Sequence, residues 1–184
     1  MLNAIGSKID LSVPDSECGY YDMVSDLLDS EVVQQMKQYI QHGHTTTFQH
    51  CLNVSYYNYL LCKLLSLDCR AGARAGLLHD LFLYDWHDYV KAPGQRMHGW
   101  THAGTALSNV RKYFTITPKE ADIIEKHMFP MNIALPKYRE TVVIICVDKF
   151  CGAWEVVAHW GYLMKLLATL PARKYREHKE HRAA

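Results

Sequence analysis

The sequence predicts an all-α fold, and two observations carry this prediction. Apolar residues recur at helical spacing through most of the chain, and residues that commonly cap helices stand where that spacing begins. The run from Thr141 to Val147 is rich in β-branched residues, which also suits a strand. Because its amphipathic spacing continues beyond the run and the sequence offers no partner strand, we expect a helix there as well.

In the first half of the chain, the pattern predicts helices that each begin at a polar capping residue. The apolar face of the first helix ends shortly before Gly43, which breaks the chain. The long helix after it carries His50 on its apolar stripe. These predicted helices cover about residues 30–40, 48–66 and 68–80, and their caps are Ser30, one of Thr45 to Thr47, and Asp68.

In the second half, an irregular segment is followed by further helices. Residues 83–100 are aromatic, charged and interrupted by Pro93-Gly94, so we expect a long loop there. Thr101 can cap the helix that follows, and the sequence Thr117-Pro118-Lys119-Glu120 combines a cap, a first-turn proline and a capping-box glutamate. The remaining predicted elements are a helix over 139–159, an apolar helical segment over 160–170 and a charged, solvated tail from about 173.

Length and composition fit one globular domain. The chain has 184 residues, of which 49% are hydrophobic and 21% are charged, and this length allows a sizeable core. The net charge of +1 gives no general attraction to long nucleic acid or to a membrane surface. No apolar run approaches the ~18 residues that a membrane span needs. The N-terminus lacks a signal-peptide pattern and the six cysteines read as reduced thiols, so we expect a cytoplasmic protein.

Six histidine and aspartate residues stand out against this apolar, helical background. His79 and Asp80 are adjacent within an apolar stretch and Asp148 lies inside a Val- and Ile-rich run, so each carboxylate must have a partner. Imidazole nitrogen and carboxylate oxygen are the usual ligands of catalytic transition-metal ions. Taken singly, each residue also has an ordinary interpretation, such as an ion pair from Asp80 to Arg70 or Arg74. The full set is His50, His79, Asp80, His102, His127 and Asp148.

The order of these residues, H…HD…H…H…D, resembles that of the HD-domain metalloenzymes over about half of the chain, from His50 to Asp148. The resemblance implies a helical bundle around a buried site for two divalent transition-metal ions (Fe, Mn, Zn, Ni or Co). It implies one domain over residues 1–184 with a metal-binding core over about 44–159, on which the N-terminal helices and the C-terminal helix pack. The implied first metal site is His50, His79, Asp80 and Asp148, and the second is Asp80, His102 and His127, with Asp80 as the bridge.

The same resemblance implies a metal-dependent phosphohydrolase, either a phosphomonoesterase or a phosphodiesterase, that uses a metal-activated water. The expected substrate is a small phosphorylated molecule such as a nucleotide, because the balanced charge argues against long nucleic acid. Two alternatives stay open. Mixed-valent di-iron oxygenases of this superfamily use the same ligand order, and a non-catalytic sensor or interaction domain could hold a structural metal. The pattern specifies no oligomeric state.

Residues near the metal ligands in sequence supply further candidates. Besides the bridging Asp80, we assign catalytic roles to Asp85 and His87, which are close enough to it in sequence to act as a general base or to support a ligand. The segment Tyr84–Trp100 lies between metal ligands, so we expect it to form one wall of the substrate pocket. Candidate contacts to an anionic substrate are Lys91, Arg96, His98 and Lys149, with a solvated surface position as the alternative for each.

Overall fold

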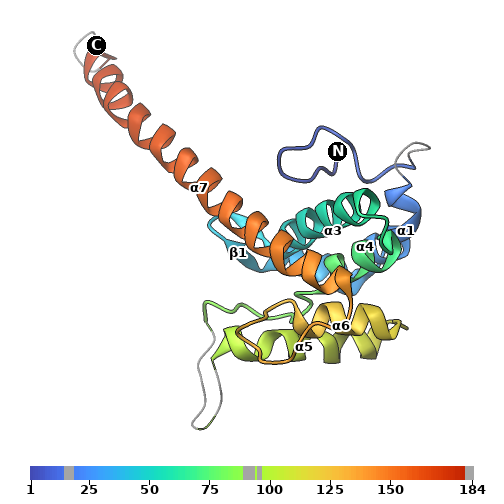
Figure 1. The fold of residues 1–184 in the computed structure, drawn as a ribbon. Coiled ribbons are helices and arrows are strands. Elements are labelled where there is room, and N and C mark those ends of the chain that lie inside the picture. The colour runs from blue at the N-terminus through green and yellow to red at the C-terminus, as the bar shows by residue number, and fades with distance from the viewer. Residues whose placement is uncertain (15–18, 89–93, 95–96, 181–184) are drawn as a thin grey trace.

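The computed structural model is mostly helical, and this confirms the all-α prediction (Figure 1). The structure describes residues 1–14, 19–88, 94 and 97–180, with side chains as far as Leu166. Within those residues the only sheet is a short antiparallel hairpin. In chain order the described elements are α1 (Tyr20–Leu28), α2 (Glu31–Gln34), the 3₁₀ helix η1 (Gln35–Gln38), β1 (Ile40–His42), β2 (Thr45–Thr46), α3 (Thr47–Leu64), α4 (Cys69–Leu78), α5 (His98–Tyr113), α6 (Pro118–Lys126) and α7 (Arg139–Glu180).

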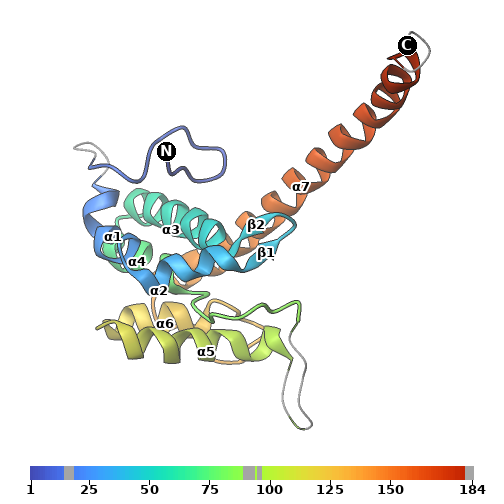
Figure 2. The ribbon, with the colours of Figure 1, turned by 180° about the vertical axis from the view of Figure 1, so that it is seen from behind.

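The helices form two layers beside the first half of α7. Figures 1 and 2 show α1, α3 and α4 together in one layer, and α5 and α6 side by side in another. The layers meet where α6 packs on α4, and α7 contacts α3, α4 and α6. The hairpin of β1 and β2 lies beside α3 and α7. Segments that are far apart in the sequence therefore meet at the boundary between the layers.

Helices α3 and α4 approach closely because a glycine faces α3. A Cβ atom at Gly76 would lie 2.7 Å from the Cα atom of Ser55, so any side chain there would force the two backbones apart. The close approach brings His79, at the end of α4, against His50 on α3, with ring centroids 5.3 Å apart. The small residue thus positions two of the predicted metal ligands.

Three helices begin at the predicted capping residues. Thr46 and Asp68 each accept a hydrogen bond from a backbone N–H group in the first turn of α3 and of α4. Thr117 and Glu120 form a reciprocal capping box at the start of α6, with Pro118 in its first turn. Each such cap contributes about 1 kcal/mol to helix stability.

Two local predictions are wrong, and helix α1 was not predicted. In place of the helix predicted over residues 30–40, the structure has α2, which ends at Gln34, followed by the 3₁₀ helix η1. Helical structure stops there because the residues after η1 pair as β1 and β2 around Gly43, whose φ is 59°. Thr101 does not cap α5, which begins at His98; its hydroxyl donates to the His98 carbonyl oxygen instead. Helix α1 follows Gly19 and has no capping side-chain hydrogen bond, so it carries no start signal.

Helix α7 is continuous from Arg139 to Glu180, where the sequence predicted a helix, a separate apolar segment and a charged tail. The β-branched run over 141–147 is helical, as predicted. The second half of α7 extends away from the bundle (Figure 1), and Val157, Trp160 and Met164 are 69%, 62% and 64% exposed. The expected packing of the C-terminal helix on the core therefore applies only to its first half. Within the described part of the chain, no helix combines the length and apolar character that a membrane crossing requires.

Candidate metal centre

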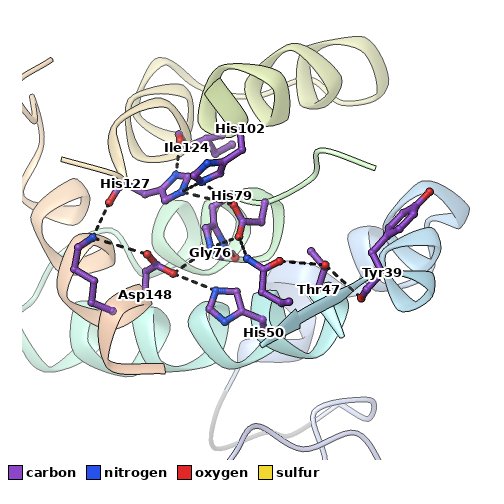
Figure 3. A network of polar contacts seen from close by, with 12 residues as sticks. Tyr39, Thr47, His50, Gly76, His79, His102, Ile124, His127 and Asp148 are labelled. Carbon is purple, nitrogen blue, oxygen red and sulfur yellow. Dashed lines mark hydrogen bonds and ion pairs between the residues drawn. The ribbon is translucent and has the colours of Figure 1, made fainter. Parts of the chain in front are cut away.

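Three histidine side chains are oriented by hydrogen bonds to their own backbone. Each Nδ1 atom lies near a carbonyl oxygen three or four residues earlier, so Nδ1–H donates and Nε2 faces the layer boundary (Figure 3). The pairs are His79 with Gly76 at 2.8 Å, His102 with His98 at 3.1 Å and His127 with Ile124 at 2.8 Å. A bond of this kind to the second ring nitrogen is typical of histidines that bind metals.

Asp80 lies between these histidines. Its Oδ1 atom is 3.4 Å from His102 Nε2 and 3.6 Å from His127 Nε2. Its Oδ2 atom is 3.5 Å from His79 Nε2 and accepts a hydrogen bond of 2.7 Å from Gln41 Nε2. Because Asp80 is 2% exposed, both oxygens depend on protein groups or bound ions rather than on bulk water.

A second group of ligand atoms forms on the His79 side of Asp80. His50 Nε2 is 3.1 Å from Asp148 Oδ1, and His79 Nε2 is 3.6 Å from the same oxygen. His50, His79 and Asp80 lie close enough to hold one ion, and Asp80 with the histidines of α5 and of the α6 end could hold another. The structure thus brings all six predicted ligands together from α3, α5, α7 and the ends of α4 and α6.

The unpaired atoms of this cluster fit a cation. His79 Nε2 and Asp80 Oδ1 are buried and have no hydrogen-bond partner among the described residues. His102 Nε2 and His127 Nε2 are 3.0 Å apart, and with Nδ1–H donating on each ring both present a lone pair. Two facing lone pairs require a proton or a metal ion between them. Atoms bonded to one ion at ~2.0–2.1 Å lie roughly 3.0–3.5 Å apart, which is close to the spacing here.

The charges around the cluster also favour a cation. Burial lowers the pKa of His50, but hydrogen bonds to two carboxylates outweigh burial and raise this pKa to about 10. Burial and the neighbouring His79 lower the pKa of His127 to about 3, so its Nε2 is unprotonated at neutral pH. Burial alone would raise the pKa of Asp80, whereas the surrounding imidazoles, His79 first, lower it to about 2. The central carboxylate is therefore charged at neutral pH and is stabilised by positive charge beside it.

Two residues that support the ligands were not predicted. Glu155 is buried on α7 and accepts hydrogen bonds from His50 Nδ1 at 3.0 Å and Asn53 Nδ2 at 2.7 Å. The sequence contains a signal for Glu155, because this residue follows Asp148 by two helical turns and so lies on the same face of the helix. Gln41, the donor to the central carboxylate, stands in strand β1 just beyond the helix predicted over residues 30–40, and nothing in the sequence marks it.

The ion-pair alternative for Asp80 is not what the structure shows. Arg74 pairs with Asp26 at 2.5 Å and with Glu120 at 3.4 Å. Arg70 contributes to the electrostatic field that lowers the pKa of Asp26, after the hydrogen bond and charge of Arg74. The basic residues on α4 therefore interact with acidic residues of α1 and α6, whereas the carboxylate of Asp80 contacts the histidines and Gln41.

A cleft of about 650 Å³ opens onto the cluster. Its two walls are largely apolar, and Lys149 is the one lysine in its described lining. Gly152 and Ala153, about one turn after Asp148 on α7, are small, and a Cβ atom at Gly152 would lie 3.1 Å from Nε2 of His42, another residue of the lining. The lining residues are Gln41, His42, Asp80, Trp86, His98, Gly99, His102, His127, Met128, Asp148, Lys149, Gly152, Ala153, Val156 and Val157.

The predicted wall segment contributes Trp86 and His98, which line the cleft and stack with ring centroids 5.6 Å apart. His98 Nδ1 is 2.8 Å from the Tyr84 hydroxyl. Burial, followed by the charge of His102, lowers the pKa of His98 to about 4, so His98 offers a neutral ring to a ligand. Lys149 also lines the cleft, with Nζ 3.4 Å from the carbonyl oxygen of His127.

Other predicted residues take no place in the cluster. Asp85 Oδ1 and His87 Nδ1 are 3.0 Å apart on the surface, and neither side chain lines the cleft or joins the described metal-binding groups. Both residues are close to Asp80 in the sequence, but of residues 85–87 only Trp86 has a side chain in the described lining of the cleft. Lys91 and Arg96, predicted to contact substrate, lie outside the described residues.

Comparisons with models of protein families, with curated proteins and with solved structures gave no match for this chain.

Proposed function

We propose that the protein is an HD-type, metal-dependent phosphohydrolase that acts on a small phosphorylated molecule. The proposal rests on one observation: the two carboxylate oxygens of Asp80 have different neighbours. Its two oxygens face separate groups of imidazole nitrogens, and the Nε2 atoms of one group are 3.0 Å apart. A carboxylate in this position suits a bridge between two ions, and a bridged ion pair is the usual arrangement for hydrolysis of phosphate esters.

Two bound divalent ions would supply a water whose pKa is lowered toward neutrality and positive charge for the phosphate oxygens. Each protein residue near the two ions would have its own role. Asp80 would be held by both ions while Gln41 fixes the rotation of its carboxylate. Glu155 orients the His50 ring through Nδ1. Lys149, at the cleft lining, would add one positive charge for a substrate anion.

The cleft supports a small substrate. A volume of about 650 Å³ lies in the range typical of small-molecule sites. Trp86 and His98 present flat rings on one side, and Ala153 and Val156 present aliphatic surface on the other. An ester with its phosphate at the cluster and an organic group between these walls would fill the space.

The test combines metal content with phosphate release. The full chain, purified without chelator, is assayed by elemental analysis and then against a panel of nucleotides, sugar phosphates and aryl phosphates under air and under argon. We expect about two ions per chain and phosphate release that is equal in both atmospheres and abolished by chelator. Failure to hydrolyse any phosphate ester when both ions are bound would refute the proposed hydrolase.

A di-iron oxygenase is a second candidate, and the apolar walls of the cleft favour it. Ala153, Val156, Val157 and Met128 offer an aliphatic surface that suits an apolar substrate at least as well as a sugar. The same assay distinguishes the two candidates. Iron as the bound metal, with oxygen consumption that depends on an organic substrate, would select the oxygenase.

A further inference from the structure

The second half of α7 carries an apolar face with a seven-residue period. Positions 153 and 160, 156 and 163, and 157 and 164 are each one heptad apart and all apolar. Such positions share one face of a helix and correspond to the a, d and e positions of helices that pair. We call this face the α7 stripe; it consists of Ala153, Val156, Val157, Trp160, Leu163 and Met164.

The bundle leaves most of the α7 stripe uncovered. Val157, Trp160 and Met164 are 69%, 62% and 64% exposed, and Val156 is 40% exposed. Figures 1 and 2 show that, beyond the hairpin of β1 and β2, α7 extends with no other described element beside it. A contiguous apolar face of this kind is unusual on a monomer, and a helix without tertiary packing gains little stability from its backbone alone.

We propose that the α7 stripe pairs with the α7 stripe of a second copy of this chain. The seven-residue period is the one that lets two helices keep their apolar faces in contact over several turns. The same face on both chains is sufficient for a symmetric dimer, since a two-fold axis brings a patch against itself. The stripe itself contains no charged residue, so two copies would not repel each other across the seam.

The exposed area is large enough for such a pairing. With one exposed tryptophan, one methionine and two valines, each stripe presents on the order of 500 Å², and two copies would bury roughly 1,000 Å². This value reaches the lower limit for a specific interface. Contacts between polar residues that flank the two stripes would add to it.

The pairing would also reach the cleft. Ala153, Val156 and Val157 belong both to the α7 stripe and to the cleft wall. A second copy seated on the stripe would therefore stand at the edge of the cleft and narrow its opening. The dimer itself does not depend on the proposed hydrolase activity.

The test measures association of the full chain by sedimentation equilibrium from 1 to 100 µM, a range of about two decades chosen to bracket weak interfaces. We expect a dimer for the wild type. Trp160→Glu should raise its dissociation constant by ~30-fold or more, the effect of losing a central aromatic side chain. Trp160→Ala, which adds no charge, should weaken the dimer in the same direction.

Ala158→Glu is the matched control, because Ala158 is exposed on the same helix but stands about 160° around it from Trp160, away from the α7 stripe. This variant should remain a dimer. Circular dichroism confirms that each variant is folded. A monomeric wild type at every concentration would overturn the proposal, as would an unchanged dimer in both Trp160 variants. Binding of a monomeric wild type to phosphatidylglycerol vesicles would assign the stripe to a lipid surface instead.

Discussion

Replacing Glu155 by glutamine tests how the metal centre is held together. Glu155 is 1% exposed and accepts two hydrogen bonds, one from His50 Nδ1 and one from Asn53 Nδ2. A glutamine can keep only one acceptor oxygen there. If that oxygen stays with Asn53, the amide N–H₂ group faces the Nδ1–H of His50, and two donors oppose each other. The His50 ring must then rotate, which moves Nε2 away from Asp148, or change tautomer, which puts the proton on Nε2 and removes the lone pair that would bind a metal.

The expected loss is a ~10–100-fold weaker metal affinity at the group that contains His50, or about 1.4–2.7 kcal/mol. We expect the upper end, because the substitution both removes a negative charge beside His50 and reverses a hydrogen bond. The group of Asp80, His102 and His127 does not touch Glu155, so its affinity should change by less than about threefold. Competition of Mn²⁺ or Zn²⁺ with a chromogenic chelator measures both affinities.

Glu140→Gln provides the control. Glu140 is also a buried glutamate on α7, but it contacts Lys119 and the backbone of Asp68 rather than a metal ligand. The Glu140→Gln substitution should lower the free energy of unfolding without changing metal affinity. If Glu155→Gln binds both ions as tightly as the wild type, the view that Glu155 orients His50 for metal binding is refuted.

Two further predictions concern occupancy and pH. Asp80→Ala should bind neither ion, whereas His127→Ala should keep the ion held by His50 and lose the other; elemental analysis gives the ratio, and equal content in both variants would contradict a bridging Asp80. Metal affinity should rise with pH across the neutral range, because the pKa of His50 without a metal is about 10 and an ion must displace that proton. Calorimetric titration in two buffers of different ionisation enthalpy should therefore detect proton release on binding, and proton-free binding at pH 7 would contradict this assignment.

The ligands could be predicted from the sequence because each one breaks a strong pattern. A buried histidine or aspartate on a helix costs free energy unless it has a partner, and six such residues in five segments indicate that they meet at one site. Glu155 is buried for the same reason, but the sequence does not single it out, because an acidic residue beside Trp154 and Val156 is typical of the polar side of an amphipathic helix. Gln41 has no comparable signal, because a neutral amide is common at any position.

The path of the chain was harder to predict where an element is short or where its packing partner is not encoded in its own sequence. The strands of the hairpin are too short for a period of two to appear, and the β-branched and aromatic residues there also suit a helix end. For α7, the helical period was correct throughout, but periodicity does not say what an apolar face packs against. The same stripe that suggested burial on the core is exposed in the structure.

Helix α5 depends on the ligand cluster more than its length suggests. It packs chiefly on α6, and at its start His98 contacts Phe82, Tyr84 and Trp86 of the segment after α4. Two polar links reach the residues next to α4: Asn109 donates to the Leu81 carbonyl oxygen, and His102 meets Asp80. A bound ion would turn the second of these links from a close approach into a bond between the two layers. Loss of the metal would then first cause local opening of α5. Amide hydrogen exchange would become faster in α5, while the α3–α4 pair stays closed.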